Sequence, residues 1–357
     1  MMATLNSANA GICGLSKSMH TRPSEPLECE TRKSLAVPRP QDTLLSEINL
    51  PLTGTFYPLG YPVEILTNSA DVLMAAYESF GHARECRPRP PLDIRVGVSR
   101  GSSSSTLSEP TRREYNHLYS MVADGENQAI LDLQRCTGFT WVTEQAVKNR
   151  LYFRYNFLEK VVYLLLGSSV VTDLHAACIS KNGKGILLCG DSGAGKSTLA
   201  YACARAGWTY TSDDTSYLIN DSHPPHVIGH SHRARFRPAA KLLFPELAGF
   251  DLSTRLEGKP SLELPTSALP IGSTAPEVEV SFIVYLNRSS PGLGRLLKLP
   301  DGTGARRLCS ELYSAGEIRA KHEQKIEALW TTPTFELQYQ STEEAMEILD
   351  LLLISYR

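Results

Sequence analysis

The segment Gly190 to Ser197 constrains the fold of this chain more than any other feature. It reads Gly-Asp-Ser-Gly-Ala-Gly-Lys-Ser and satisfies the pattern G-x-x-x-x-G-K-[ST]. The apolar run Gly185 to Cys189 precedes it, and Ser197 to Ala206 has the composition of a helix that Gly207 ends. The order of strand, glycine-rich loop and helix predicts an α/β domain with a P-loop.

This loop predicts a phosphate-binding site. Its glycines let successive backbone N–H groups turn toward phosphate oxygens, and the following helix directs its positive end at them. Lys196 adds a mobile positive charge, and the Ser197 hydroxyl can hold Mg²⁺. The alternative is a glycine-rich turn that binds nothing. We expect ATP and Mg²⁺ as cofactors, with a nucleotide-binding set of Gly190, Asp191, Ser192, Gly193, Ala194, Gly195, Lys196, Ser197 and Thr198.

Two adjacent carboxylates follow the next expected strand, Trp208 to Thr211. In a doubly wound sheet, Asp213 and Asp214 would lie at the edge where phosphates bind. One can hold Mg²⁺ while the other takes a proton, which suits phosphoryl transfer. The alternative is a solvated Asp-Asp turn. His175 precedes a strand that can lie beside the strand before the loop, so it could pair with either aspartate, although a single histidine is more often structural.

The stretch His230 to Lys241 is basic. It reads either as a mobile loop in which Arg235 and Arg237 clamp the transferred group, or as a solvated basic surface. Lys259 and Arg288 are further candidates for phosphate contacts. The histidines nearby lack the spacing of a metal site, so we expect no structural zinc.

The chain of 357 residues divides by composition into three parts. Residues 1–43 are rich in Ser, Pro, Thr and charge, and predict a disordered tail. Residues 44–150 predict a small α+β accessory domain, with a helix at Ala70 to Phe80 and a strand at Leu92 to Ser99. Residues 151–357 predict the nucleotide-binding domain.

Charge and cysteine usage exclude several classes of partner. The formal net charge is -2, so no global positive field attracts nucleic acid or anionic lipid. The 8 cysteines are scattered singly, which fits a reduced compartment. No apolar stretch predicts a secretory leader or a membrane span. We expect a cytoplasmic protein with no membrane partner.

His175, the loop at 190–197 and Asp213-Asp214 together resemble the catalytic domain of bacterial HPr kinase/phosphorylase, over roughly Leu174 to Leu218. The resemblance implies a P-loop core of the HPr kinase and phosphoenolpyruvate carboxykinase type. It implies an active-site set of His175, Lys196, Ser197, Asp213 and Asp214, with Ser197 and the aspartates at the metal, and it suggests assembly into a homo-oligomer. Because the elements by which that family recognises HPr are not found, the broader HPr kinase-like group is the better match.

These features predict a kinase that transfers the γ-phosphoryl group of ATP to a hydroxyl acceptor. The resemblance implies a serine acceptor, which could be free, in a peptide or in a protein. The main alternative is a non-catalytic regulatory or scaffold protein that binds nucleotide. Chemistry like that of phosphoenolpyruvate carboxykinase ranks lower, because no second His/Lys/Asp constellation for Mn²⁺ is seen.

Overall fold

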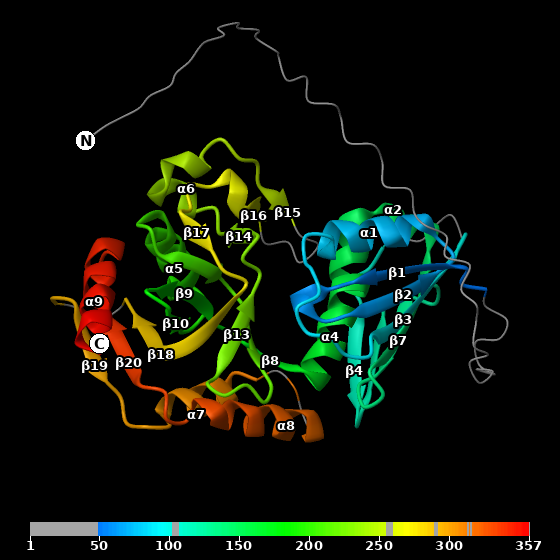
Figure 1. Ribbon diagram of the computed structural model, residues 1–357. Coiled ribbons are helices and arrows are strands. Elements are labelled where there is room, and N and C mark those ends of the chain that lie inside the picture. The colour runs from blue at the N-terminus through cyan, green and yellow to red at the C-terminus, as the bar shows by residue number, and fades with distance from the viewer. Residues whose placement is uncertain are drawn as a thin grey trace, which may run out of the picture. The chain divides into compact units, whose positions relative to one another are not determined.

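The computed structural model describes residues 49–101, 107–254, 260–288, 292–312, 314 and 316–356, all within one structural unit. The expected disordered tail at 1–43 and Lys259 lie outside these residues. Mixed sheets and helices alternate along the chain, so the predicted α/β class is confirmed (Figure 1).

The first half of the described chain forms a seven-stranded sheet in the order β1-β2-β3-β7-β6-β5-β4. Strand β3 runs parallel to both β2 and β7, and the other neighbours are antiparallel. The expected strand Leu92 to Ser99 is confirmed as β3. The strands are β1 (Leu52–Phe56), β2 (Val63–Thr67), β3 (Leu92–Ser99), β4 (Thr111–Tyr115), β5 (Leu118–Val122), β6 (Gln128–Asp132) and β7 (Thr137–Thr143).

Helices cover this sheet with their apolar faces. The expected helix Ala70 to Phe80 is confirmed as α1, which buries Val72, Ala75, Ala76 and Phe80 along one side. Spacings of three and four residues place such side chains on a single face of a helix. The remaining helical segments are α2 (Glu144–Lys148), α3 (Arg150–Phe153), the π-helical turn η2 (Arg154–Leu158) and α4 (Glu159–Ser169).

The second large sheet has the order β17-β11-β9-β10-β18-β13-β12-β8, with β20 joining β18 and β19 joining β20. Strand β10 runs parallel to β18 and antiparallel to β9, and β11 is antiparallel to β9. Strands β10, β11 and β18 therefore end at the same edge. The strands are β8 (Val171–Leu174), β9 (Ala177–Lys181), β10 (Lys184–Cys189), β11 (Thr209–Ser212), β12 (Ser216–Ile219), β13 (His226–Gly229), β17 (Ser273–Thr274), β18 (Glu277–Asn287), β19 (Arg295–Lys298) and β20 (Thr334–Gln338).

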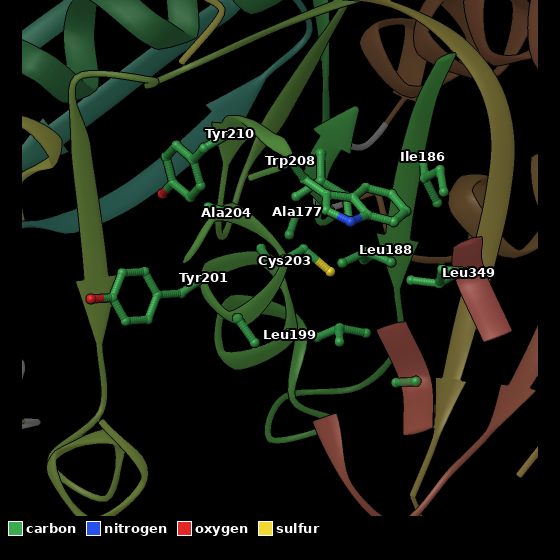
Figure 2. Close-up of a cluster of buried hydrophobic side chains, with 14 of the residues drawn as sticks. Ala177, Ile186, Leu188, Leu199, Tyr201, Cys203, Ala204, Trp208, Tyr210 and Leu349 are labelled. Atoms are coloured by element: carbon green, nitrogen blue, oxygen red, sulfur yellow. The ribbon is translucent and has the colours of Figure 1, made fainter. Parts of the chain in front are cut away.

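Helices cover both faces of this sheet. Helices α5 (Lys196–Arg205) and α9 (Thr342–Ser355) pack on one face, and α7 (Thr303–Ser310) and α8 (Gly316–Ile326) pack on the other (Figure 1). Figure 2 shows the first of these cores, which includes Trp208, Tyr201 and Leu349 together with the sheet residues Ile186 and Leu188. Removing a fully buried aromatic side chain such as Trp208 costs roughly 3–5 kcal/mol. This core fixes α5 against β10, and with it the loop that joins them.

A small third sheet corrects one expectation. The basic stretch at 230–241 was expected to be a mobile loop or a solvated surface, but its centre is strand β14 (Arg233–Phe236), which pairs with β16 (Pro260–Pro265). Strand β15 (Ser253–Thr254) pairs with β16 from the other side. Helix α6 (Ala240–Leu243) follows β14. Alternate burial of Ala234 and Phe236 anchors β14 in the core, so Arg235 extends from a fixed strand.

The boundary expected at residue 150 falls inside the helical segment that joins the two large sheets, and the division into two domains stays a prediction. Val161 and Leu165 of α4 pack in the core of the first sheet, and Tyr217 and Ile228 of the second sheet join the same core. Within the described residues, no helix combines the length and apolar character needed to cross a membrane. The cytoplasmic location also stays a prediction.

Candidate active site

The glycine-rich loop joins the end of β10 to the start of α5, as its sequence context predicts. Gly190, Gly193 and Gly195 have positive φ angles of 139°, 92° and 100°. Such angles strain any residue with a Cβ atom. At Gly195 an added Cβ would also lie 2.9 Å from the Tyr339 hydroxyl. Gly195 caps α5 without a side-chain hydrogen bond, so the helix presents backbone N–H groups at this end.

Lys196 folds back over the loop and meets His175. Its Nζ donates to the carbonyl oxygens of Gly190, at 2.5 Å, and Asp191, at 3.3 Å. Nε2 of His175 lies 2.9 Å from the same Nζ. Burial lowers the pKa of Lys196, although nearby carboxylates, first Asp214, oppose this effect. Burial and then the charge of Lys196 lower the pKa of His175. His175 therefore serves as a neutral acceptor for the lysine ammonium.

The two aspartates follow β11 at the same edge and lie in different environments. Asp213 is buried and Asp214 is half-buried. Oδ2 of Asp213 accepts from the backbone N–H of Arg235 at 2.7 Å, while its carbonyl oxygen accepts from Ser197 Oγ at 3.0 Å. Burial, then the charge of Asp214, raises the pKa of Asp213 to about 6. Nδ1 of His175 lies 3.8 Å from Oδ1 of Asp214, beyond hydrogen-bonding distance, so His175 lies beside the acidic pair and its pairing with an aspartate stays a prediction.

Arg235 lies between the acidic pair and a carboxylate that the sequence did not single out. Its guanidinium is 3.6 Å from Asp214 and donates to Glu263 at 3.1 Å. Glu263 also accepts from Arg233 at 2.9 Å. Burial alone would raise the pKa of Glu263, but the two arginines lower it to about 2. Glu263 stays ionised and holds both guanidinium groups in place.

A cavity of about 700 Å³ opens beside the loop. The lysine, the acidic pair and Arg235 all line it, and so do His175, Arg237 and Arg288. Arg237 is exposed, so it lies at the cavity without being fixed there. Gly190, Asp191 and Ala194 are not among the lining residues. Of the residues that the sequence predicts for the site, those that line the cavity are His175, Ser192, Gly193, Gly195, Lys196, Ser197, Thr198, Asp213, Asp214, Arg235 and Arg237.

The residues at this site fit a magnesium ion that takes most of its ligands from substrate phosphates and water. The described residues contain no group of three or more His, Cys, Asp or Glu side chains that could hold a metal by themselves. Mg²⁺ commonly uses one or two carboxylates together with substrate phosphates and water. The Ser197 hydroxyl donates a hydrogen bond to the carbonyl oxygen of Asp213, so it lies beside the acidic pair. These oxygen donors match the preference of Mg²⁺ for hard ligands.

The sequence did not predict several charged residues outside the glycine-rich loop that contact the site residues or act on their charges. Arg233, Glu263 and Glu159 form a chain of charged contacts, in which Arg233 lies 3.8 Å from Glu159. Glu311 lies near enough to Lys196 for its charge to raise the pKa of the lysine. None of these positions has a spacing that marks it, because each meets the site only through folding.

Comparisons with known proteins give little further information. No family model matches the chain, and no curated protein matches it. Among solved structures, the HPr(Ser) kinase/phosphatase from Coxiella burnetii is similar with a TM-score of 0.31 and 11% identity, over 52% of this chain and 92% of that chain. A similarity this weak establishes neither the activity nor the site, so the function has to be argued from the chain's own residues.

Proposed function

We propose that this protein is a kinase that uses ATP and Mg²⁺ and transfers the γ-phosphoryl group to a hydroxyl acceptor. The observation that carries the proposal is the meeting of Lys196, Ser197, Asp213 and Asp214 around one cavity at the end of β10 and β11. A buried lysine, uncapped helix N–H groups and a glycine-rich turn favour a polyphosphate. An adjacent acidic pair favours metal-assisted transfer over simple binding.

The donor would lie against the loop. Its phosphates would accept hydrogen bonds from the backbone N–H groups at the start of α5. They would also replace Gly190, Asp191 and His175 as the hydrogen-bonding partners of the Lys196 ammonium. Ser197 and Asp214 would hold Mg²⁺, which neutralises charge on the β- and γ-phosphates. Arg235 and Arg237 would line the path of the transferred group, with Arg235 fixed by Glu263.

Asp213 would act as the general base. Its pKa of about 6 makes it basic enough to take the proton of an alcohol and leaves it ionised near neutral pH. The backbone N–H of Arg235 orients one of its oxygens, so the carboxylate approaches the acceptor in a fixed geometry. A serine hydroxyl is the acceptor that we propose, in the free amino acid, a peptide or a protein.

The experiment that tests this function uses the full chain, Mg²⁺ and ATP labelled at the γ-phosphate. Label should pass to serine, to serine-containing peptides or to a fraction of a cell lysate, and Lys196→Ala should abolish the transfer. Asp213→Asn should keep most of the nucleotide binding and lose transfer. Tight nucleotide binding with no transfer to any acceptor would instead support a regulatory or scaffold protein that binds nucleotide.

A further inference from the structure

A second cavity lies on the other side of the acidic pair. Its volume is about 680 Å³, within the range of pockets that bind small molecules. Its walls come from strands β4 and β5, helix α4, strands β8 and β12, and helix α8, so it lies between elements that belong to both large sheets. Representative lining residues are Arg112, Tyr119, Tyr163, Asp173, Tyr217 and His322.

The two cavities meet at Asp213, Asp214 and Arg235, which line both. A base between two cavities can reach a donor in one and an acceptor in the other. The buried Asp213 and the half-buried Asp214 form this boundary, and Arg235 crosses it from the fixed strand β14. Transfer in line between two substrates needs this arrangement, with the phosphoryl group at the boundary.

One carboxylate of the second cavity, that of Asp173, can bind a cation, and the basic residues Arg112 and Lys160 also line the cavity. Glu159 and Glu263 are neutralised within the protein, because Arg154, Arg233 and Arg235 contact them. Asp173 is exposed, and none of the described residues forms a salt bridge with it. It stands opposite Tyr217 in the pairing of β8 with β12. Its carboxylate therefore remains available to a ligand.

Aromatic rings stand beside this carboxylate. The ring of Tyr217 stacks on that of Tyr163 with centroids 5.6 Å apart, and His230 packs edge-on against both. A cation over the face of a tyrosine ring is stabilised by the negative face of that ring. Carboxylate and tyrosine rings together recognise an ammonium group better than a second anion.

Resting on the kinase function proposed above, we infer that this second cavity is the acceptor pocket and takes a small amino alcohol, with its ammonium group at Asp173 and its hydroxyl at Asp213. The acceptor oxygen forms a bond to the γ-phosphorus of ATP, and the bond from that phosphorus to the oxygen bridging the β- and γ-phosphates breaks. The hydroxyl proton passes to Asp213. The products are a phosphorylated amino alcohol and ADP, which stays beside the glycine-rich loop.

Two nearly isosteric probes test the class of acceptor. 2-Aminoethanol carries the ammonium group, and 1,2-ethanediol replaces it with a hydroxyl. Binding of each probe to the full chain without nucleotide is measured by calorimetry, and ADP release is measured with ATP and Mg²⁺. We expect 2-aminoethanol to bind and to be phosphorylated at least 10-fold more efficiently, in kcat/KM, than 1,2-ethanediol. Equal response to the two probes, or no binding of either, would overturn the inference.

Two variants locate the binding site. Asp173→Asn should raise KM for 2-aminoethanol about 10-fold or more, whereas Asp350→Asn, which removes a carboxylate from α9 outside both cavities, should leave it unchanged. An unchanged KM in Asp173→Asn would place the acceptor elsewhere even if the protein is a kinase. Calorimetry with ATP separates the two failures, because a chain that binds no nucleotide contradicts the kinase function itself.

Discussion

The backbone N–H of Arg235 donates to Oδ2 of Asp213 at 2.7 Å, so strand β14 orients the carboxylate that follows β11. Main-chain hydrogen bonds keep their donors in place more firmly than mobile side chains do. The same residue sends its guanidinium toward Asp214 and Glu263. Position 235 therefore serves the acidic pair twice, once through its backbone and once through its side chain.

Lys196→Ala should weaken nucleotide binding. Removal of one charge-assisted hydrogen-bonding group costs about 1.5–3 kcal/mol, which corresponds to a rise in the Kd for ATP of roughly 10- to 100-fold. The measurement is calorimetric titration with ATP and Mg²⁺. Lys298→Ala, which changes an exposed lysine on β19, is the matched control. A Kd shared by wild type and Lys196→Ala would contradict the role of the lysine.

Asp213→Asn should stabilise the fold near neutral pH. Burial and the charge of Asp214 raise the pKa of Asp213 from 3.8 to about 6, so its ionisation opposes folding. At about 1.4 kcal/mol for each pKa unit, the variant should gain roughly 2–3 kcal/mol at pH 7. Because the folded state binds the extra proton between pH 6 and 4, the gain should shrink as the pH falls through that window.

Urea denaturation of wild type and Asp213→Asn at several pH values measures this difference. The asparagine carbonyl can still accept from the backbone of Arg235, so the hydrogen bond is kept. Asp350→Asn is the control, since it removes a carboxylate that pairs with Lys181 at the surface. A destabilised Asp213→Asn at pH 7 would show that the aspartate supports the fold rather than straining it.

The rate of transfer should depend on pH through the same carboxyl group. A base with a pKa of about 6 is protonated below that value, so kcat/KM should rise through pH 6 and then level off. Initial rates at saturating ATP between pH 5 and 8 give the profile. A rate that stays constant down to pH 5 would assign the base to another group.

Acid should weaken the protein through His232, which is half-buried. Burial, then the charges of His82 and Arg233, lowers the pKa of His232 to about 3, while Glu263 opposes them. The unfolded chain takes up the proton near pH 6.5, so folded stability should fall as the pH drops below that value. His232→Phe keeps a ring to stack on His82 and should flatten this decline.

Denaturation at pH 7 and pH 5 tests this dependence. His117→Phe, at an exposed position on the turn between β4 and β5, is the comparison. If both variants keep the same pH dependence as wild type, the acid sensitivity arises elsewhere in the protein.

Much of the second sheet follows from local sequence signals. The strands around the loop are short apolar runs, and the turn at Asn182 and Gly183 has the positive φ angles that the residues favour. Ser341 caps α9 by accepting from the backbone N–H of Glu344, a local interaction for which serine is favoured at the start of a helix. Such features depend on neighbours in the chain, and they can be seen without the fold.

The first sheet and the outer parts of the site could not be predicted in the same way. Strand β4 is exposed along its whole length and carries Arg112, Arg113 and Glu114, so no alternation of apolar residues marks it. It exists because β5 pairs with it. Glu263 meets Arg235 only through the register of β14 with β16, which joins residues 28 positions apart. Pairing at such distances is decided by tertiary packing.

Helix α4 connects the hydrophobic core of the first sheet to the second cavity, so changes in that core can affect which ligand the cavity binds. Val161 and Leu165 are buried in the core of the first sheet, while Lys160, Tyr163 and Leu164 line the second cavity. One rigid segment of 11 residues thus faces a hydrophobic interior on one side and a binding surface on the other. A larger side chain at the buried position Val161 would strain the packing of the helix and shift its backbone, so natural selection could change the cavity without altering any residue that lines it.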